Sequence, residues 1–128
     1  MYNSMMLREI ILVGAGGAAG SILRYLVALA VNGNGNRARP VATLIVNVAG
    51  CFVIGCVAGL AQRFEWIPEY RLLLAAGFCG GFTTFSAFAL ENLRFLEQKD
   101  YVSVMTYVFL SVTLSIGAAF AGLVISRG

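Results

Sequence analysis

The residues best suited to bind an ion lie in the middle of an apolar run, from Gly77 to Phe88 (GFCGGFTTFSAF). Three Gly and three hydroxyl residues occur together there, and each interior Gly lowers helix propensity by about 0.8–1.0 kcal/mol relative to Ala. We therefore expect a helix that is broken near residues 80–84. Backbone groups freed at membrane depth must be buried or line a cavity, where carbonyls would suit a small cation. The alternative is an unbroken helix whose small residues allow close packing.

The same segment places Phe82, Phe85 and Phe88 three residues apart. An aromatic ring has a positive edge, so rings along a narrow path would favour an anion without holding it tightly. Phe in a membrane helix ordinarily contacts lipid or the protein core, and the spacing alone does not decide between these roles.

Polar side chains also recur every four residues in two other apolar runs. Thr43, Asn47 and Cys51 share one helix face. The Asn47 amide could donate to an anion or hydrogen-bond a neighbouring helix. A second face forms a hydroxyl track roughly 18 Å long at 1.5 Å per residue, made of Ser103, Tyr107, Ser111 and Ser115. The three Cys are most simply small buried apolar residues.

Two charged residues lie within or beside the apolar runs. Arg24 interrupts the first run; its side chain could reach the membrane surface, form an anion-attracting vestibule, or pair with Glu91. Glu91 ends the third run. No carboxylate lies at the centre of any run, which argues against a proton-coupled or cation-coupled antiporter.

Four apolar runs must position these residues. Each run is about 20 residues long, which is the length that a membrane-spanning helix needs. The chain of 128 residues is 59% hydrophobic and 12% charged, whereas a soluble domain carries about 25% charged residues. A water-soluble enzyme and a disordered tail are therefore excluded. We predict an all-α membrane protein with a single domain over residues 1–128. Its helices are expected at about 10–31, 41–61, 72–94 and 101–126, the third broken at mid-membrane.

The charge distribution does not select an orientation. Four spans place both chain ends on one side, with four basic residues on each side. These are Arg8, Arg63, Arg71 and Arg127 on the terminal side, and Arg37, Arg39, Arg94 and Lys99 on the other. The positive-inside rule takes orientation from such a bias. Either a boundary residue is misassigned, or the chain inserts both ways and two copies pair antiparallel about an axis in the membrane plane.

Other apparent motifs carry no chemistry. The segment from Gly14 to Gly20 (GAGGAAG) is similar to a dinucleotide fingerprint, but it lacks a βαβ unit and an acidic residue about 20 positions on. Gly16 and Gly20 are better explained as a helix-contact face. The chain has no His and therefore no credible zinc ligand set. It also has no basic run for nucleic acid, and no residue is assigned a catalytic role.

Together these segments resemble the Fluc fluoride channels, also called the CrcB family. The resemblance covers GGAAGSILRY, ATLIVNVAGCFVIG, GFCGGFTTFSAFALE and the hydroxyl track of the fourth run. Its most specific motif is Gly-Gly-x-Thr-Thr-Phe-Ser-x-Phe, followed three residues later by Glu. The resemblance implies a passive fluoride-selective channel in the cell inner membrane that exports cytoplasmic fluoride and so relieves its toxicity.

The resemblance also implies an assembly and a set of site residues. The assembly is an antiparallel, dual-topology homodimer with two pores built from both subunits. A structural sodium ion lies on its two-fold axis, bound by the backbone carbonyls of Gly80 and Thr83. By motif position, the fluoride path is lined by Asn47, Phe85, Ser86, Phe88, Tyr107, Ser111 and Ser115, with Arg24 at the vestibule and Glu91 without an assigned role. Ala87 stands where a hydroxyl is common, which leaves the local coordination of fluoride open.

Two other functions share this size and span count. A four-helix dual-topology multidrug antiporter needs a membrane-embedded carboxylate, and its transport would depend on protons. A membrane scaffold would use the polar residues only for helix contacts, and the purified protein would then move no ion.

Overall fold

The computed structural model describes residues 1–33 and 40–128, so Arg37 and Arg39 of the predicted charge balance lie outside the described residues. Four helical segments are long and apolar enough to cross a membrane: Tyr2–Asn32, Pro40–Arg63, Pro68–Glu97 and Tyr101–Arg127. The prediction of an all-α protein with four membrane-spanning helices is therefore confirmed.

The helix ends extend beyond the apolar runs. Helix α1 (Tyr2–Asn32) begins at Tyr2 and not near residue 10 as predicted, because the polar residues ahead of the apolar run continue the helix. One of these, Arg8, forms an ion pair with Glu69, with 3.5 Å between Nη1 and Oε1. Helix α2 (Pro40–Arg63) starts at a proline, a residue that suits the first turn because its missing N–H needs no partner there. Hydropathy locates the hydrocarbon segment and not the end of the helix.

The third span consists of four pieces. It begins with α3 (Pro68–Arg71) and continues as η1 (Leu72–Cys79), a π-helix that the sequence did not predict. A short α4 (Gly80–Phe82) and the longer α5 (Phe85–Glu97) follow. Between them, Thr83 (φ −83°, ψ 155°) and Thr84 (φ −149°, ψ 119°) have extended backbone. We call these two residues the interruption.

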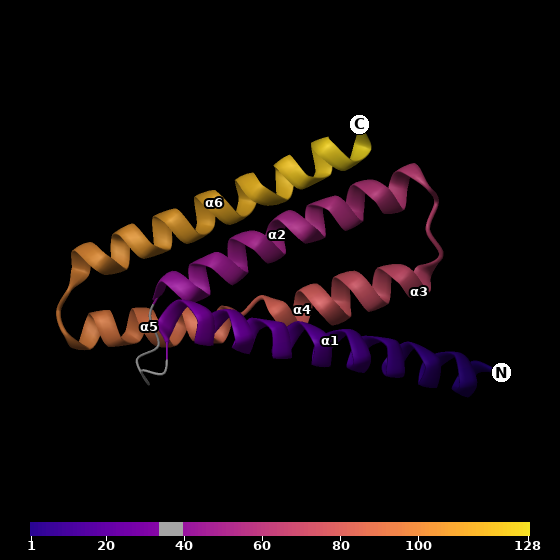
Figure 1. The fold of residues 1–128 in the computed structure, drawn as a ribbon, viewed down its shortest axis with the longest axis horizontal. Coiled ribbons are helices and arrows are strands. Elements are labelled where there is room, and N and C mark those ends of the chain that lie inside the picture. Colours follow the sequence, from indigo (N-terminus) through magenta and orange to yellow (C-terminus); the bar gives the residue numbers. More distant parts are fainter. Residues whose placement is uncertain (34–39) are drawn as a thin grey trace.

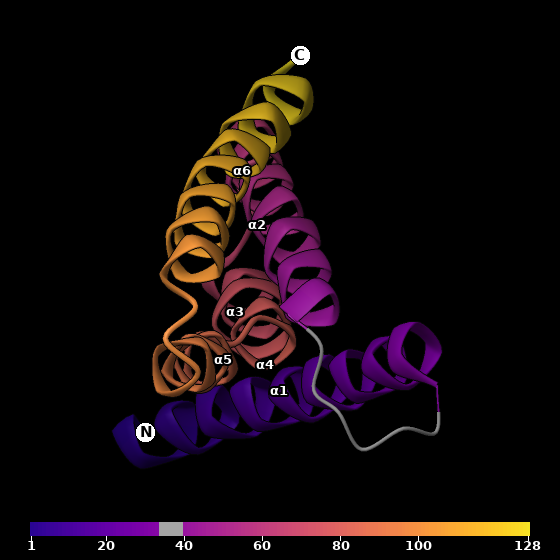
Figure 2. The same ribbon diagram turned by 90° about the vertical axis from the view of Figure 1, so that its left-hand side faces the viewer.

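The third span lies between α1 on one side and the pair formed by α2 and α6 (Tyr101–Arg127) on the other (Figures 1 and 2). Both chain termini lie at the same end of the molecule (Figure 1). Glycines allow α2 and α6 to approach closely: a Cβ on Gly55 would lie 2.0 Å from the Ala119 carbonyl oxygen. Gly55 and Gly59 therefore act as a packing pair.

A second close contact joins α1 to the first half of the third span. A Cβ on Gly16 would lie 2.3 Å from the Leu73 carbonyl oxygen, and one on Gly20 would lie 2.2 Å from that of Phe78. From the other side, a Cβ on Gly81 would lie 2.4 Å from the carbonyl oxygen of Gly17. We call this contact the glycine seam. It confirms the predicted contact face of Gly16 and Gly20, and it brings the two backbones into direct contact.

The start of α6 is capped by Asp100. Its carboxylate accepts hydrogen bonds from the Ser103 hydroxyl (2.6 Å) and the Ser103 amide (3.2 Å). Both hydrogen bonds hold the pKa of Asp100 below its usual range, and the bond from the Ser103 hydroxyl has the larger effect. Ser103, at the start of the predicted hydroxyl track, therefore directs its hydroxyl to the helix cap. An N-cap acceptor satisfies backbone donors that a helix start leaves free.

The glycine seam predicts different effects for two substitutions on the same helix. Gly20→Ala should lower the thermal unfolding midpoint of the purified protein in detergent, because a methyl group there overpacks the seam at about 1–3 kcal/mol. Gly14→Ala is the matched control, since no heavy atom of another described helix lies within 4 Å of its Cβ position. It should be neutral or slightly stabilising. Equal midpoints for the two variants would contradict the seam.

Candidate functional site

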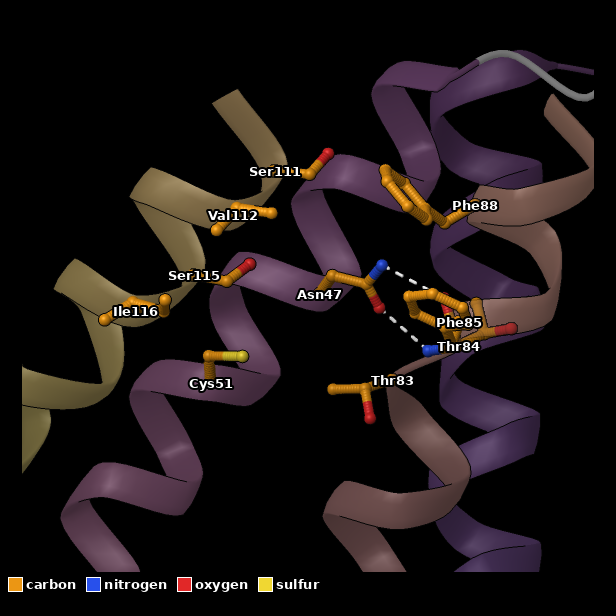
Figure 3. Close-up of a pocket in the computed structure, with 10 residues that line it drawn as sticks. All are labelled: Asn47, Cys51, Thr83, Thr84, Phe85, Phe88, Ser111, Val112, Ser115 and Ile116. Atoms are coloured by element: carbon orange, nitrogen blue, oxygen red, sulfur yellow. Dashed lines mark hydrogen bonds between the residues drawn. The ribbon is translucent and has the colours of Figure 1, made fainter. Parts of the chain in front are cut away.

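A cavity of about 360 Å³ lies beside the interruption, between α2, α5 and α6 (Figure 3). Five of the predicted pore residues share its wall: Asn47, Phe85, Phe88, Ser111 and Ser115. The remaining lining residues are Cys51, Thr83, Thr84, Val112 and Ile116. The wall is mostly apolar with a few convergent polar groups, which is the usual character of a ligand site.

Asn47 joins α2 to the interruption through two hydrogen bonds (Figure 3). Its Nδ2 donates to the Thr84 carbonyl (3.0 Å), and its Oδ1 accepts from the Thr84 amide (2.7 Å). The side chain thus satisfies backbone groups that the extended conformation removes from the helix. An amide nitrogen carries two donor hydrogens, and the hydrogen bond to the Thr84 carbonyl uses one of those of Asn47. The other hydrogen remains available to a ligand in the cavity.

Thr84 also starts helix α5. Its Oγ1 accepts a hydrogen bond from the Ala87 amide (3.2 Å), as an N-cap residue does. The hydroxyls of Thr84 and Ser86 lie 3.2 Å apart. Ser86, predicted in the fluoride path, is therefore next to the cap and not among the residues that line the cavity.

The aromatic rings form a connected group at the cavity. Phe85 and Phe88 have ring centroids 5.4 Å apart at an angle of 45°. Phe88 meets Tyr107 edge to face, at 5.1 Å and 76°. Phe85 remains 79% exposed in the single chain. Phe88 therefore packs against two rings, whereas Phe85 packs against one and is largely exposed.

Two serines contribute hydroxyls from α6. Ser111 and Ser115 lie one helical turn apart and face the cavity on the side across from Phe88 (Figure 3). The Ser111 side chain is 7% exposed, and its Oγ has no hydrogen-bond partner among the residues that the structure describes. A buried hydroxyl without a partner costs about 1–3 kcal/mol. Its position at the wall therefore indicates a polar occupant of the cavity.

Glu91 is the centre of a buried polar cluster outside this cavity. It is 4% exposed and accepts hydrogen bonds from Thr43 Oγ1 (2.7 Å) and from the Tyr107 hydroxyl. We call Thr43, Glu91 and Tyr107 the Glu91 cluster. Its members come from α2, α5 and α6, so it ties three helices together. The Tyr107 hydroxyl, predicted to line the fluoride path, is directed to Glu91. Residue spacing placed Thr43 on the face of Asn47 but could not reveal its partner.

Arg24 contacts the backbone of α4, just before the interruption. Its Nε donates to the Gly81 carbonyl with a distance of 3.0 Å. It lines a second cavity of about 150 Å³, together with Glu91 among others. Among the described residues, no ion pair joins Arg24 to Glu91, so the alternative that these two residues pair is wrong.

Gly80 and Thr83, predicted to bind sodium, lie at the start and the end of the segment that includes α4. The carbonyls of Cys79 and Thr84 accept the hydrogen bonds made at the interruption, and that of Gly81 accepts one just before it. The carbonyls of Gly80 and Thr83 are not among these acceptors. Within residues 1–33 and 40–128 no group of three or more His, Cys, Asp or Glu side chains could hold a metal. A metal ion at this site would therefore need backbone oxygens.

Comparison with known proteins assigns the family. The family model described as "CrcB-like protein, Camphor Resistance (CrcB)" matches residues 11–123. The chain belongs to the CrcB family. The resemblance recognised from the sequence motifs is thereby confirmed.

Curated CrcB relatives carry the name fluoride-specific ion channel FluC. That of Rhizobium johnstonii is 50% identical over 123 residues, which cover 93% of this chain and 96% of the relative. That of Gloeothece citriformis is 41% identical over 121 residues, covering 94% and 98%. That of Azobacteroides pseudotrichonymphae is 36% identical over 123 residues, covering 95% and 98%. The family is one of ion channels, which is not an enzyme class, and the four apolar helices identify this member as a multi-pass membrane protein.

The Glu91 cluster predicts a stability effect. Thr43→Val keeps the side-chain shape but removes the donor to Glu91, which leaves a buried carboxylate oxygen without that partner. The expected loss is about 1–3 kcal/mol, measured as a lower thermal unfolding midpoint in detergent. Thr113→Val, at an exposed position on α6, is the matched control and should change little. An unchanged midpoint for Thr43→Val would show that the cluster does not hold the helices.

Proposed function

We propose that this chain is a fluoride-selective ion channel that lets cytoplasmic fluoride leave the cell passively through the plasma membrane. The observation that carries the proposal is the cavity beside the interruption, where an amide, two hydroxyls and two phenyl rings converge. The proposal is supported by relatives of the same length that are named fluoride-specific ion channels. Hydrofluoric acid enters a cell as a neutral molecule and dissociates inside, so a passive anion path suffices for export.

The chemistry of the cavity wall suits a small, strongly hydrated anion. The free Asn47 hydrogen and the hydroxyls of Ser111 and Ser115 can replace water as donors. The ring edges of Phe85 and Phe88 carry partial positive charge. Removing water strengthens every electrostatic interaction in the path. Several weak contacts in series let the ion enter and also leave.

A sodium ion is proposed at the interruption, held by the carbonyls of Gly80 and Thr83. Oxygen ligands suit a hard cation, and these two carbonyls are not used by the hydrogen bonds that close the interruption. When bound, the ion would supply fixed positive charge near the fluoride path. The chain's own groups would still bind the anion and exclude water.

The channel is proposed to be an antiparallel homodimer with two pores, in which the interruption lies at mid-membrane. Phe85 supports a partner at the cavity, because a ring that is 79% exposed at the cavity wall is incompletely covered in one chain. The balanced basic residues support insertion in both orientations. In such a pair, each subunit would complete the cavity wall of the other.

Dual insertion predicts that a tag placed after Gly128 is accessible on both faces of the membrane. About half of the tags should react with a membrane-impermeant reagent in intact spheroplasts, because the basic residues favour neither orientation. Permeabilised spheroplasts provide the total. A tag that is accessible on one face in every molecule would contradict the antiparallel dimer.

The proposed function predicts fluoride release from proteoliposomes that contain the purified protein. A fluoride electrode should record rapid efflux once a potassium ionophore carries the compensating charge, and chloride should be retained. Phe88→Ile should reduce fluoride efflux to the protein-free leak, because it keeps apolar bulk but removes the positive ring edge.

Phe120→Ile is the matched control, since this ring is 66% exposed on α6 and does not line the cavity. Size-exclusion chromatography checks that both variants assemble as the unmodified protein does. Vesicles that retain fluoride would overturn the proposed function, whereas unchanged efflux in Phe88→Ile would remove only the ring-edge contribution.

A further inference from the structure

The wall of the cavity contains a thiol that the family motifs do not explain. Cys51 lies one helical turn beyond Asn47 on α2, lines the cavity and points into it near Thr83 (Figure 3). Its side chain is partly exposed. The other two cysteines differ: Cys79 is 1% exposed, and Cys56 is not among the lining residues. The sequence suggested a buried role for all three; Cys79 is buried, whereas Cys51 and Cys56 are both partly exposed in the single chain.

A second observation indicates that this cavity holds polar species. The Ser111 hydroxyl lines the same space, is more than nine-tenths buried and has no partner among the described residues. Such a group needs water or an ion in the cavity. Cys51 lines the same cavity as this hydroxyl. A thiol reacts as its thiolate, and the thiolate forms only where water can accept the proton.

We propose that Cys51 is a covalent modification site in the wall of the fluoride path, and that a small S-thiolating reagent bonded there closes the path. The inference rests on the proposed function. With methyl methanethiosulfonate, the thiol first gives its proton to water. The thiolate then attacks the thiomethyl sulfur, a disulfide forms, the bond between that sulfur and the sulfonyl group breaks, and methanesulfinate leaves with the electron pair.

The modified side chain projects two additional heavy atoms into the cavity. A path narrow enough to remove the water from a small anion leaves no room for that anion to pass such a group. Methionine has nearly the same shape as S-methylthiocysteine, since both carry two further atoms and a methyl end beyond Cβ. Cys51→Met is therefore a permanent mimic of the modified state, whereas Cys51→Ser cannot be modified.

The test uses the full chain in fluoride-loaded proteoliposomes, with methyl methanethiosulfonate as the probe. Reagent should reduce fluoride efflux to the protein-free leak in the unsubstituted chain and in the variant Cys56→Ser/Cys79→Ala, which retains only Cys51. Dithiothreitol should restore efflux. Cys51→Ser should keep its own untreated rate in the presence of reagent, and Cys51→Met should leak slowly without any reagent.

Intact-protein mass spectrometry provides a readout that does not depend on transport. One thiomethyl group should be added to the unsubstituted chain and none to Cys51→Ser. Fluoride efflux without an adduct on Cys51 overturns only the reactive-thiol assignment. An adduct with undiminished efflux shows that Cys51 does not line the path. Untreated protein that moves no fluoride overturns the proposed function and, with it, the blocking step.

Discussion

The structure depends on one constraint: within a bilayer, every backbone polar group needs a partner inside the protein. The Thr83 amide still donates to the Cys79 carbonyl, but Thr84 leaves the helical hydrogen-bond pattern. Lipid cannot replace what Thr84 loses. Asn47 provides the replacement, since a single side chain both donates to and accepts from Thr84. This exchange fixes α5 relative to α2. The position of the cavity follows from it, because Phe88 and Thr84 belong to the segment that Asn47 holds.

Two different kinds of contact support the halves of the third span. Its first half meets α1 through the glycine seam, where backbones touch and no side chain intervenes. Its second half is held by the Glu91 cluster, where a buried carboxylate receives two hydroxyl donors. The first contact depends on shape and the second on hydrogen bonding. The interruption lies where one kind of support ends and the other begins, and Asn47 bridges that point.

The architecture could be predicted from the sequence because hydropathy and helix periodicity are local properties. Four spans and the contact face of Gly16 and Gly20 could be predicted from runs and spacing. The shared cavity wall of Asn47, Phe88 and the two serines Ser111 and Ser115 was expected only from the family resemblance. The π-helix at Leu72–Cys79 could not, because this segment is apolar throughout and no polar residue marks the period of its turns. The partners of Glu91 also depend on how helices rotate against one another. Cys51 was assigned by residue type, although its spacing from Asn47 placed it on the cavity face.

The hydrogen bond from Arg24 to Gly81 has an electrostatic consequence. A guanidinium keeps its charge at any physiological pH, and this one is anchored to main chain and partly buried. Dissolved salt screens such a charge far less than it screens a mobile cation at the surface. The attraction that it exerts on an approaching anion is therefore a permanent property of the fold, largely independent of the electrolyte outside.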